Sequence, residues 1–175
     1  MAELLVCREF DRVDKAPFMN VYKESSSENA VRWYPELSAE AALQKYEEGY
    51  ADYMAHGFAD EGGLSFILQE NGVYVCALRL FPRGDGQFYL EALETHPAYR
   101  QRGYGTQLLN KMTAYLAAEN PFFTVTSHVK KTNTASIRTH LAAGFIIAAD
   151  YVVEDGERFD GDFLLEYRRP QKPLL

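Results

Sequence analysis

The hydrophobic pattern of the chain predicts a domain that mixes helices with strands. Apolar side chains recur at helical spacing between Ser38, a typical helix cap, and Gly57, a typical helix stop. Before this helix, residues 3–10 read as a strand, and the polar stretch through Asn29 reads as a helix whose limits the pattern leaves undefined.

An antiparallel meander of three strands is predicted after that helix. Strand-like runs cover residues 64–69, 73–80 and 88–95. The Asn-Gly pair at 71–72 is a hairpin signal, and the turn-like residues 82–86 separate the second run from the third. Short connections of this kind favour antiparallel neighbours.

A further strand and two helices follow the meander. The apolar stripe of residues 106–119 predicts a helix, and residues 123–129 predict a strand. Because a helical crossover joins them, this strand should lie parallel to strand 88–95. Asn133 then caps a short helix that Gly144 stops.

The end of the chain predicts a closing hairpin. Its strands are residues 145–153 and 163–167, and Asp155 and Gly156 provide the turn. No internal repeat or linker-like stretch interrupts the 175 residues. We therefore expect a single α/β domain, residues 1–175, with a mixed sheet.

Composition narrows the possible functions. The formal net charge of −7 argues against a nucleic-acid binder and favours cationic partners. Cys7 and Cys76 lie in strand-like runs without metal-type spacing, so we expect two buried free thiols and no metal site. No signal-peptide pattern is present at the N-terminus, and no window approaches the roughly eighteen apolar residues of a membrane span. A cytoplasmic protein without membrane contact is expected.

The strongest chemical signal is the sequence RQRGYG at residues 100–105, between a predicted strand and a predicted helix. The start of a helix exposes unpaired N–H groups and the positive end of the dipole, which favours an anion. Gly103 and Gly105 tolerate positive φ and close ligand approach, while Arg100 and Arg102 suit phosphate oxygens. The sequence therefore predicts a site for a pyrophosphate-bearing ligand.

Two common phosphate-binding templates do not fit this junction. A Walker loop needs Lys and then Ser or Thr after its last glycine, but Thr106 directly follows Gly105. The dinucleotide fingerprint needs a small residue where Leu108 stands, and a parallel strand order that the meander does not provide.

The remaining template is RxxGxG, formed by Arg100, Gly103 and Gly105. It resembles the acyl-CoA-binding signature of the GNAT N-acetyltransferases. The stretch NTASIRTHLAAGF at residues 133–145 is similar to the next motif of that family, in which an Asn opens a short helix that ends in Gly-Phe. The resemblance covers the C-terminal half by its motifs and the N-terminal half by element order.

The resemblance implies a mostly antiparallel sheet flanked by helices, whose strands 88–95 and 123–129 splay to admit acetyl-CoA as acyl donor. Backbone N–H groups of residues 102–106 would hold the pyrophosphate, and Asn133 would contact the pantetheine arm unless it serves only as a cap. The residues that the resemblance implies for cofactor binding are Leu93, Thr95, Arg100, Gln101, Arg102, Gly103, Tyr104, Gly105, Thr106, Asn133 and Ser136.

Acetyl transfer to an amine needs a base, because about one lysine-like amine in 2,500 is neutral at pH 7. Glu91 and Glu94 are the candidates on the strand that leads into the anion site, and strand alternation predicts that they face opposite sides. Relatives often carry an acidic residue near the position of Glu91. We favour Glu91 as base or water-positioning group, with a solvated or salt-bridged carboxylate as the alternative.

His140 occupies the position where many relatives carry a tyrosine, four residues before the Gly-Phe pair. A histidine with an ordinary pKa of about 6.5 is about one quarter protonated at pH 7. The sequence therefore leaves His140 open between general acid for the leaving thiolate and simple packing.

Two functions remain open. The first is an acetyl-CoA-dependent N-acetyltransferase acting on a primary amine of a small molecule or protein, with a cationic acceptor; an aminoglycoside-modifying enzyme is a special case. The second is a non-catalytic acyl-CoA-binding or regulatory module, which the missing tyrosine allows. The acyl group and a possible homodimer are undetermined. The residues expected near the acceptor are Trp33, Tyr34, Glu36, Tyr46, Glu47, Tyr50 and Tyr53.

Overall fold

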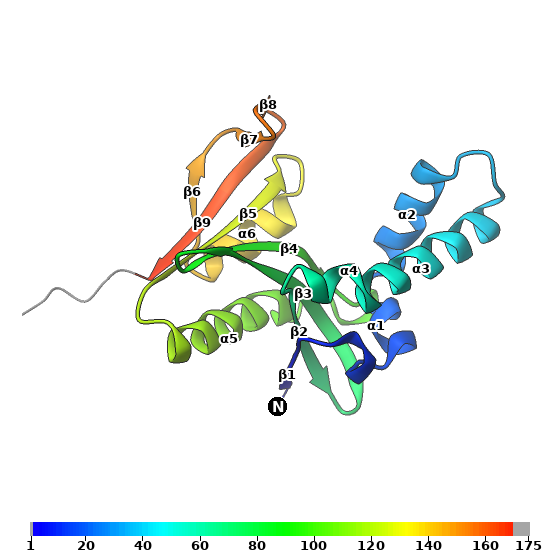
Figure 1. Ribbon diagram of the computed structural model, residues 1–175, viewed down its shortest axis with the longest axis horizontal. Helices are drawn as coiled ribbons and strands as arrows, with labels where there is room; N and C mark the ends of the chain where they lie inside the picture. The colour runs from blue at the N-terminus through cyan, green and yellow to red at the C-terminus, as the bar shows by residue number, and fades with distance from the viewer. Residues whose placement is uncertain (1, 170–175) are drawn as a thin grey trace, which may run out of the picture.

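The computed structural model describes residues 2–169 and contains a seven-stranded sheet (Figure 1). The strands, in their order across the sheet, are β1 (Glu3–Cys7), β2 (Leu64–Glu70), β3 (Val73–Gly84), β4 (Gln87–Thr95), β5 (Phe123–Lys130), β9 (Asp162–Arg169) and β6 (Ile146–Ala149). Neighbours are antiparallel except β4 and β5, which are parallel. This confirms the predicted mixed, mostly antiparallel sheet.

Helices cover both faces of the sheet (Figure 1). Those before β2 are α1 (Lys15–Val21), α2 (Lys23–Trp33), α3 (Ala39–Ala55) and α4 (Gly57–Asp60). The later ones are α5 (Tyr104–Glu119), which connects β4 to β5, and α6 (Thr134–Ala142), which connects β5 to β6. Two short 3-10 turns lie at Phe10–Arg12 and Pro97–Tyr99, and α2 and α3 project together beyond the sheet.

Two apolar clusters hold these layers together. The first packs the predicted stripe of α5, including Leu108 and Met112, against strand residues such as Phe66. The second packs α1, α3 and α4 on the other face, with Phe18 and Met54 fully buried. Burying an apolar side chain of this size contributes about 1.5–3 kcal/mol, so the layers are stabilised mainly by these clusters.

The predicted helix caps are confirmed. The Ser38 side chain accepts a hydrogen bond from the backbone N–H of Ala41 at 3.3 Å, at the start of α3. Asn133 Oδ1 accepts from the N–H of Ser136 at 3.1 Å, at the start of α6. Gly144 follows α6 with φ of +90°, a backbone angle that side chains disfavour.

Three of the predicted boundaries are wrong. The first strand, predicted over residues 3–10, ends at Cys7, and a 3-10 turn begins at Phe10. β3 continues through Pro82 to Gly84, because a bulge there lets the ladder accept a residue without an N–H, and only the pair at 85–86 turns. The predicted strand 145–153 is divided into β6 and β7 (Val152–Glu154). β7 pairs with β8 (Glu157–Phe159) instead of β9, a change of partner that apolar alternation does not record.

β4 carries a bulge at the point where it leaves β5. The two strands pair only at residues 87–89 and 124–126. Against β3, the pairing passes from Arg79 with Glu91 to Ala77 with Glu94, so two residues of β4 face one of β3. Ala92, inside this bulge, has φ of +51°. The predicted splay of the two strands is therefore present.

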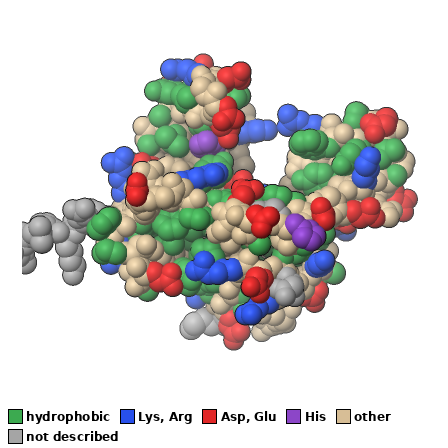
Figure 2. Space-filling view, viewed as in Figure 1, with side chains coloured by type: hydrophobic (Ala, Val, Ile, Leu, Met, Phe, Trp, Pro, Cys, Tyr) green, Lys and Arg blue, Asp and Glu red, His purple; other side chains and the backbone are tan. Residues whose placement is uncertain are grey.

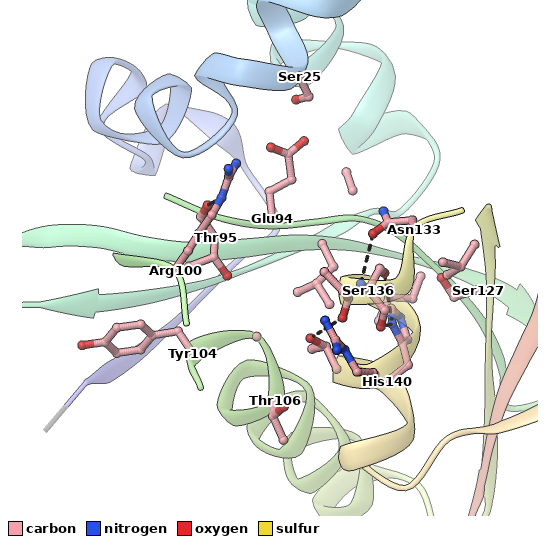
Figure 3. Close-up of a pocket in the computed structure, with 18 of the residues that line it drawn as sticks. Ser25, Glu94, Thr95, Arg100, Tyr104, Thr106, Ser127, Asn133, Ser136 and His140 are labelled. Carbon is pink, nitrogen blue, oxygen red and sulfur yellow. Dashed lines mark hydrogen bonds between the residues drawn. The ribbon is translucent and has the colours of Figure 1, made fainter. Parts of the chain in front are cut away.

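The bulge overturns the prediction that the two glutamates face opposite sides. Strand alternation requires an unbroken ladder, and the extra residue at Ala92 shifts every later side chain to the other face. Glu91 meets Arg79, which lies over the ring of Tyr50 on α3, and Glu94 points toward α2 (Figure 3). Both carboxylates therefore lie on the side of α2 and α3.

Candidate functional site

A cleft of about 1,100 Å³ opens where β4 and β5 separate. Its walls are the second half of β4, the loop that leads into α5, the end of β5, the start of α6 and one side of α2. Figure 2 shows the hollow between the projecting α2–α3 pair and the part of the molecule that contains β5 to β9. The cleft therefore joins segments from both halves of the chain.

Most residues predicted from the sequence for the site line this cleft. They are Glu91, Leu93, Thr95, Arg100, Gln101, Gly103, Tyr104, Gly105, Thr106, Asn133, Ser136 and His140. Arg102 does not line it, because its guanidinium donates to the carbonyl of Ala98 at 3.2 Å and lies 5.1 Å from the ring centre of Tyr99. The guanidinium of Arg102 is therefore engaged by local partners, and its contact with a phosphate stays a prediction. The residues expected near the acceptor do not line the cleft either: Trp33, Tyr34, Glu36, Tyr46, Glu47, Tyr50 and Tyr53.

Several other lining residues were not predicted from the sequence. They are Glu24, Ser25 and Glu28 on α2, Ser127 and His128 on β5, and Thr139 on α6. Glu24 and Glu28 stand four positions apart, so a helix places them on one face, and this spacing was the available signal. Nothing local indicated that α2 would lie over the cleft.

The glycines of the loop keep its backbone accessible. Gly103 has φ of +80° and forms the N-cap of α5, where a residue with a Cβ would be strained by about 1–2 kcal/mol. A Cβ on Gly105 would lie 2.8 Å from Cγ2 of Thr139, so α6 occupies the space of any side chain there. The first-turn N–H groups of α5 therefore border the cleft with no side chain at these two positions, as an anion site requires.

Arg100 connects the loop to α2. Its Nη1 lies 2.6 Å from Oε2 of Glu24, and its Nε donates to the carbonyl of Thr95 at 3.3 Å. About half of each charged side chain is exposed, so the pair is accessible from the cleft. An anion bound at the loop would compete with Glu24 for this guanidinium.

Glu91 lines the cleft and belongs to a network of an ion pair and a hydrogen bond with Arg79 and Tyr50. Its carboxylate lies 2.8 Å from Arg79, whose other guanidinium nitrogen donates to the hydroxyl of Tyr50 at 3.0 Å. Burial raises the pKa of Tyr50, so its hydroxyl remains neutral. The charge of Glu91 is therefore already paired, as in the salt-bridged alternative that the sequence left open.

Glu94 lies in a different environment, facing Ser25 on α2 (Figure 3). Burial raises the pKa of Glu94 above its ordinary value, and Ser25 and Arg100 offset this only in part. The carboxylates of Glu24 and Glu28 raise this pKa further. A carboxylate with a raised pKa accepts a proton more readily at neutral pH, which is the property that a general base needs.

His140 is buried on the inner side of α6, with 1% of its surface exposed. Its Nδ1–H donates to the carbonyl of Ser136 at 2.9 Å, and its ring packs edge-on against Phe145. Burial lowers the pKa of His140, and the bond to Ser136 offsets this only in part. The ring is thus neutral with Nε2 as an acceptor, which disfavours the predicted acid role.

Acidification is expected to destabilise the protein through His140. Because the pKa of His140 is lower in the folded state than its unfolded value of about 6.5, its contribution to stability is complete above that pH and is lost as the pH falls through the folded pKa. Urea unfolding at pH 7.5 and pH 5.0 measures this loss. The loss should be smaller in His140→Gln, and an equal loss in both proteins would contradict the assignment.

Cys7 is half-buried and Cys76 is buried, and neither is in a disulfide. Within residues 2–169, no group of three His, Cys, Asp or Glu side chains could hold a metal ion. No helix in this part of the chain is long and apolar enough to cross a membrane.

Solved structures share this fold. An aminoglycoside acetyltransferase in complex with coenzyme A and kanamycin matches at a TM-score of 0.64 and 17% identity, covering 97% of this chain and 95% of its own. The PaiA N-acetyltransferase from Thermoplasma acidophilum in complex with coenzyme A matches at a TM-score of 0.61 and 14% identity. The match covers 95% of this chain and 99% of the PaiA chain. YncA from Salmonella typhimurium, a putative acetyltransferase with acetyl-CoA bound, matches at a TM-score of 0.60 and 17% identity. The match covers 100% of this chain and 98% of the YncA chain. These likenesses concern the fold.

A family model places the chain more specifically. No curated protein matches it. The model of the acetyltransferase (GNAT) family, however, matches residues 21–145. This range includes α2, the glycine loop of α5 and the whole of α6 up to Phe145. The chain belongs to the GNAT family of acetyltransferases.

Proposed function

We propose that the protein is an N-acetyltransferase that transfers an acetyl group from acetyl-CoA to a primary amine of a cationic small molecule or protein. The observation that carries this proposal is the single cleft that joins an anion-binding loop to an acidic wall. The loop lies at residues 100–106, and the wall is formed by Glu24, Glu28 and Glu94.

The residues present fit a CoA molecule. The space that a Cβ would fill at Gly103 is open, so the backbone at the start of α5 is accessible to the pyrophosphate. Asn133 uses its Oδ1 for the cap of α6, so its amide nitrogen remains available for the pantetheine arm. Lys130 and Arg138 also line the cleft and supply positive charge for the 3′-phosphate.

Glu94 supplies the base. The incoming ammonium loses a proton to this carboxylate, directly or through a water molecule, and the amine nitrogen then attacks the thioester carbon. A C–N bond forms, the C–S bond breaks, and the electron pair leaves with sulfur. The nitrogen also loses its second proton, which the leaving thiolate takes up, so the products are the amide and the CoA thiol. The thiolate needs no strong acid, since its pKa is near the 8.5 of cysteine, which is consistent with a neutral His140.

The bulge at Ala92 lies where backbone N–H groups can stabilise the negative charge that develops on the thioester carbonyl oxygen during attack. The bulge leaves residues 92 and 93 outside the regular pairing of β4 with β3, and both residues line the cleft, so their backbone N–H groups are the candidates for this role. Fixed backbone N–H donors stabilise an oxyanion effectively because they need no reorganisation during the reaction.

The acidic wall indicates the type of acceptor. Three carboxylates line the cleft, those of Glu24, Glu28 and Glu94, and the ion pair with Arg100 partly offsets the negative charge of Glu24. Carboxylates gathered in a cleft raise the local concentration of cations. We therefore infer an acceptor with a second positive charge besides the reacting amine.

The test measures thiol release from acetyl-CoA with a panel of polyamines, aminoglycosides and lysine peptides, and mass spectrometry identifies the acetylated product. Acceptor-dependent release with a mass gain of one acetyl group is expected, fastest with multiply charged amines. A protein that binds acetyl-CoA but releases no thiol with any amine would instead be the non-catalytic module.

Removing the charge of Glu24 is expected to tighten CoA binding. In Glu24→Gln, Arg100 no longer has a carboxylate partner and is free for the pyrophosphate. An exposed ion pair contributes about 0.2–1 kcal/mol, so the Kd of CoA should fall by about 1.4- to 5-fold. Isothermal titration calorimetry measures the Kd.

The matched control is Glu28→Gln. It makes the same charge change one turn later on α2, where the residue also lines the cleft but is not paired with Arg100. An equal gain in CoA affinity in both variants would mean that general repulsion, and not release of Arg100, is responsible.

A further inference from the structure

Tyr22 connects the helical part of the site to the bulge of β4. It lies at the joint between α1 and α2, and only 3% of its surface is exposed. Its hydroxyl donates a hydrogen bond to the carbonyl of Ala92 at 3.0 Å, between residues 70 positions apart. Burial keeps the pKa of Tyr22 well above its ordinary value, so the hydroxyl remains a donor.

The bulge needs such a partner. Ala92 has φ of +51°, a conformation that costs a residue with a Cβ about 1–2 kcal/mol. Its carbonyl stands at the break in the ladder, where an unsatisfied buried acceptor would cost about 1–3 kcal/mol more. The Tyr22 hydroxyl satisfies this carbonyl and so favours the strained conformation over a regular strand.

The hydroxyl is placed with little freedom to move. The ring of Tyr22 packs 5.0 Å from the ring of Phe18 and 6.0 Å from that of Tyr50, measured between centroids. Its own carbonyl accepts from Oγ of Ser25 at 3.1 Å, in the first turn of α2. One residue therefore fixes both the start of α2 and the position of the bulge.

We propose that Tyr22 is a positioning residue for acetyl transfer. By holding the carbonyl of Ala92, it fixes the bulge, and the bulge turns Glu94 toward α2 and opens β4 from β5. Without this bond the strand can relax toward unbroken alternation, which would move Glu94 to the opposite face. This inference rests on the proposed function for its catalytic readout.

The first experiment measures Tyr22→Phe, which removes the hydroxyl and keeps the ring. The kcat for amine acetylation should fall about tenfold, corresponding to about 1.4 kcal/mol. The Kd of CoA should change by a smaller factor than kcat, because the pyrophosphate loop at residues 100–106 lies outside the bulge at Ala92. A residue needed only for folding would not produce this separation of kcat from CoA binding.

Rescue by a second substitution tests the route through the bulge. Glycine adopts φ of +51° without the strain of a Cβ, so Tyr22→Phe/Ala92→Gly should regain most of the lost kcat. A double variant as slow as Tyr22→Phe alone would overturn the proposal.

Tyr74→Phe is the matched control. Tyr74 belongs to the same apolar cluster, and its hydroxyl accepts only a long bond of 3.5 Å from the N–H of Asp14. Its kcat should equal that of the unaltered protein. Equal losses of kcat in Tyr74→Phe and Tyr22→Phe, or no loss in Tyr22→Phe, would overturn the positioning role.

Hydrogen exchange separates this inference from the proposed function. Amides of residues 92–95 should exchange faster in Tyr22→Phe than in Tyr74→Phe, with no substrate present. If the unaltered protein acetylates no amine, the proposed function fails, and exchange still decides whether Tyr22 holds the bulge. Equal exchange in the two variants would reject it.

Discussion

Replacing Glu94 with glutamine is expected to lower kcat/KM for amine acetylation at pH 7 by about 100-fold or more, the usual effect of removing a general base. The physical reason is the environment of this carboxylate. Burial and the nearby Glu24 and Glu28 raise its pKa, so it accepts a proton more readily than an exposed glutamate. In the unaltered enzyme, kcat/KM should rise with pH as Glu94 ionises, and Glu94→Gln should lack this step and keep only the rise caused by deprotonation of the free amine.

The same substitution is expected to stabilise the fold at neutral pH. A carboxyl whose folded pKa is raised contributes stability below its unfolded pKa of about 4.3, and this contribution is lost as the pH rises through the folded pKa. Glutamine has no charge to bury, so Glu94→Gln should unfold at a higher urea concentration at pH 7. A simultaneous loss of activity and gain of stability would identify a catalytic group.

Glu91→Gln is the matched control on the same strand. Its carboxylate is paired with Arg79, so the substitution leaves a largely buried guanidinium without its ionic partner. We expect a loss of stability of about 1–3 kcal/mol and a smaller loss of kcat/KM than in Glu94→Gln. A larger loss of kcat/KM in Glu91→Gln, with the pH dependence abolished, would return the base to Glu91.

Gly105→Ala is expected to weaken CoA binding about 10- to 100-fold. The new Cβ would lie 2.8 Å from Cγ2 of Thr139, so the start of α5 must shift away from α6. The N–H groups that hold the pyrophosphate would move with it. Alanine favours a helix more than glycine does, so a general loss of stability is not the expected cause. Calorimetric titration with CoA measures the effect.

Thr139→Ser offers a specific rescue. It removes the clashing methyl group and keeps the hydroxyl that donates to the carbonyl of Ala135 at 2.9 Å. CoA affinity in Gly105→Ala/Thr139→Ser should recover toward that of Thr139→Ser measured alone. If the double variant binds CoA as weakly as Gly105→Ala, contact between α5 and α6 is not the cause.

Short-range signals predicted much of this molecule from the sequence. The caps at Ser38 and Asn133 and the glycine loop depend on side chains within a few positions, and they are present as expected. The parallel pairing of β4 with β5 followed from the single helix between them. Local chemistry and simple connection rules were sufficient for these features.

The remaining features depend on contacts between distant segments. The bulge at Ala92 is stabilised by Tyr22, and the ladder change that reorients Glu94 is invisible in the alternation of β4 alone. Arg100 pairs with Glu24 across the cleft, which no local pattern could indicate. Burial decides the state of His140, and burial is a property of the assembled fold.

The arrangement of α2 has a consequence for how such an enzyme can change its substrate. This helix packs mainly on α3 and projects beyond the sheet, whereas the loop at residues 100–106 and α6 rest on the main apolar cluster (Figure 1). Substitutions along residues 23–33 can therefore alter the acidic wall while the anion-binding loop at residues 100–106 stays intact. Under the proposed function, the acceptor preference can therefore change without a change in the residues that bind CoA, provided that the hydrogen bond from Tyr22 to Ala92 is kept.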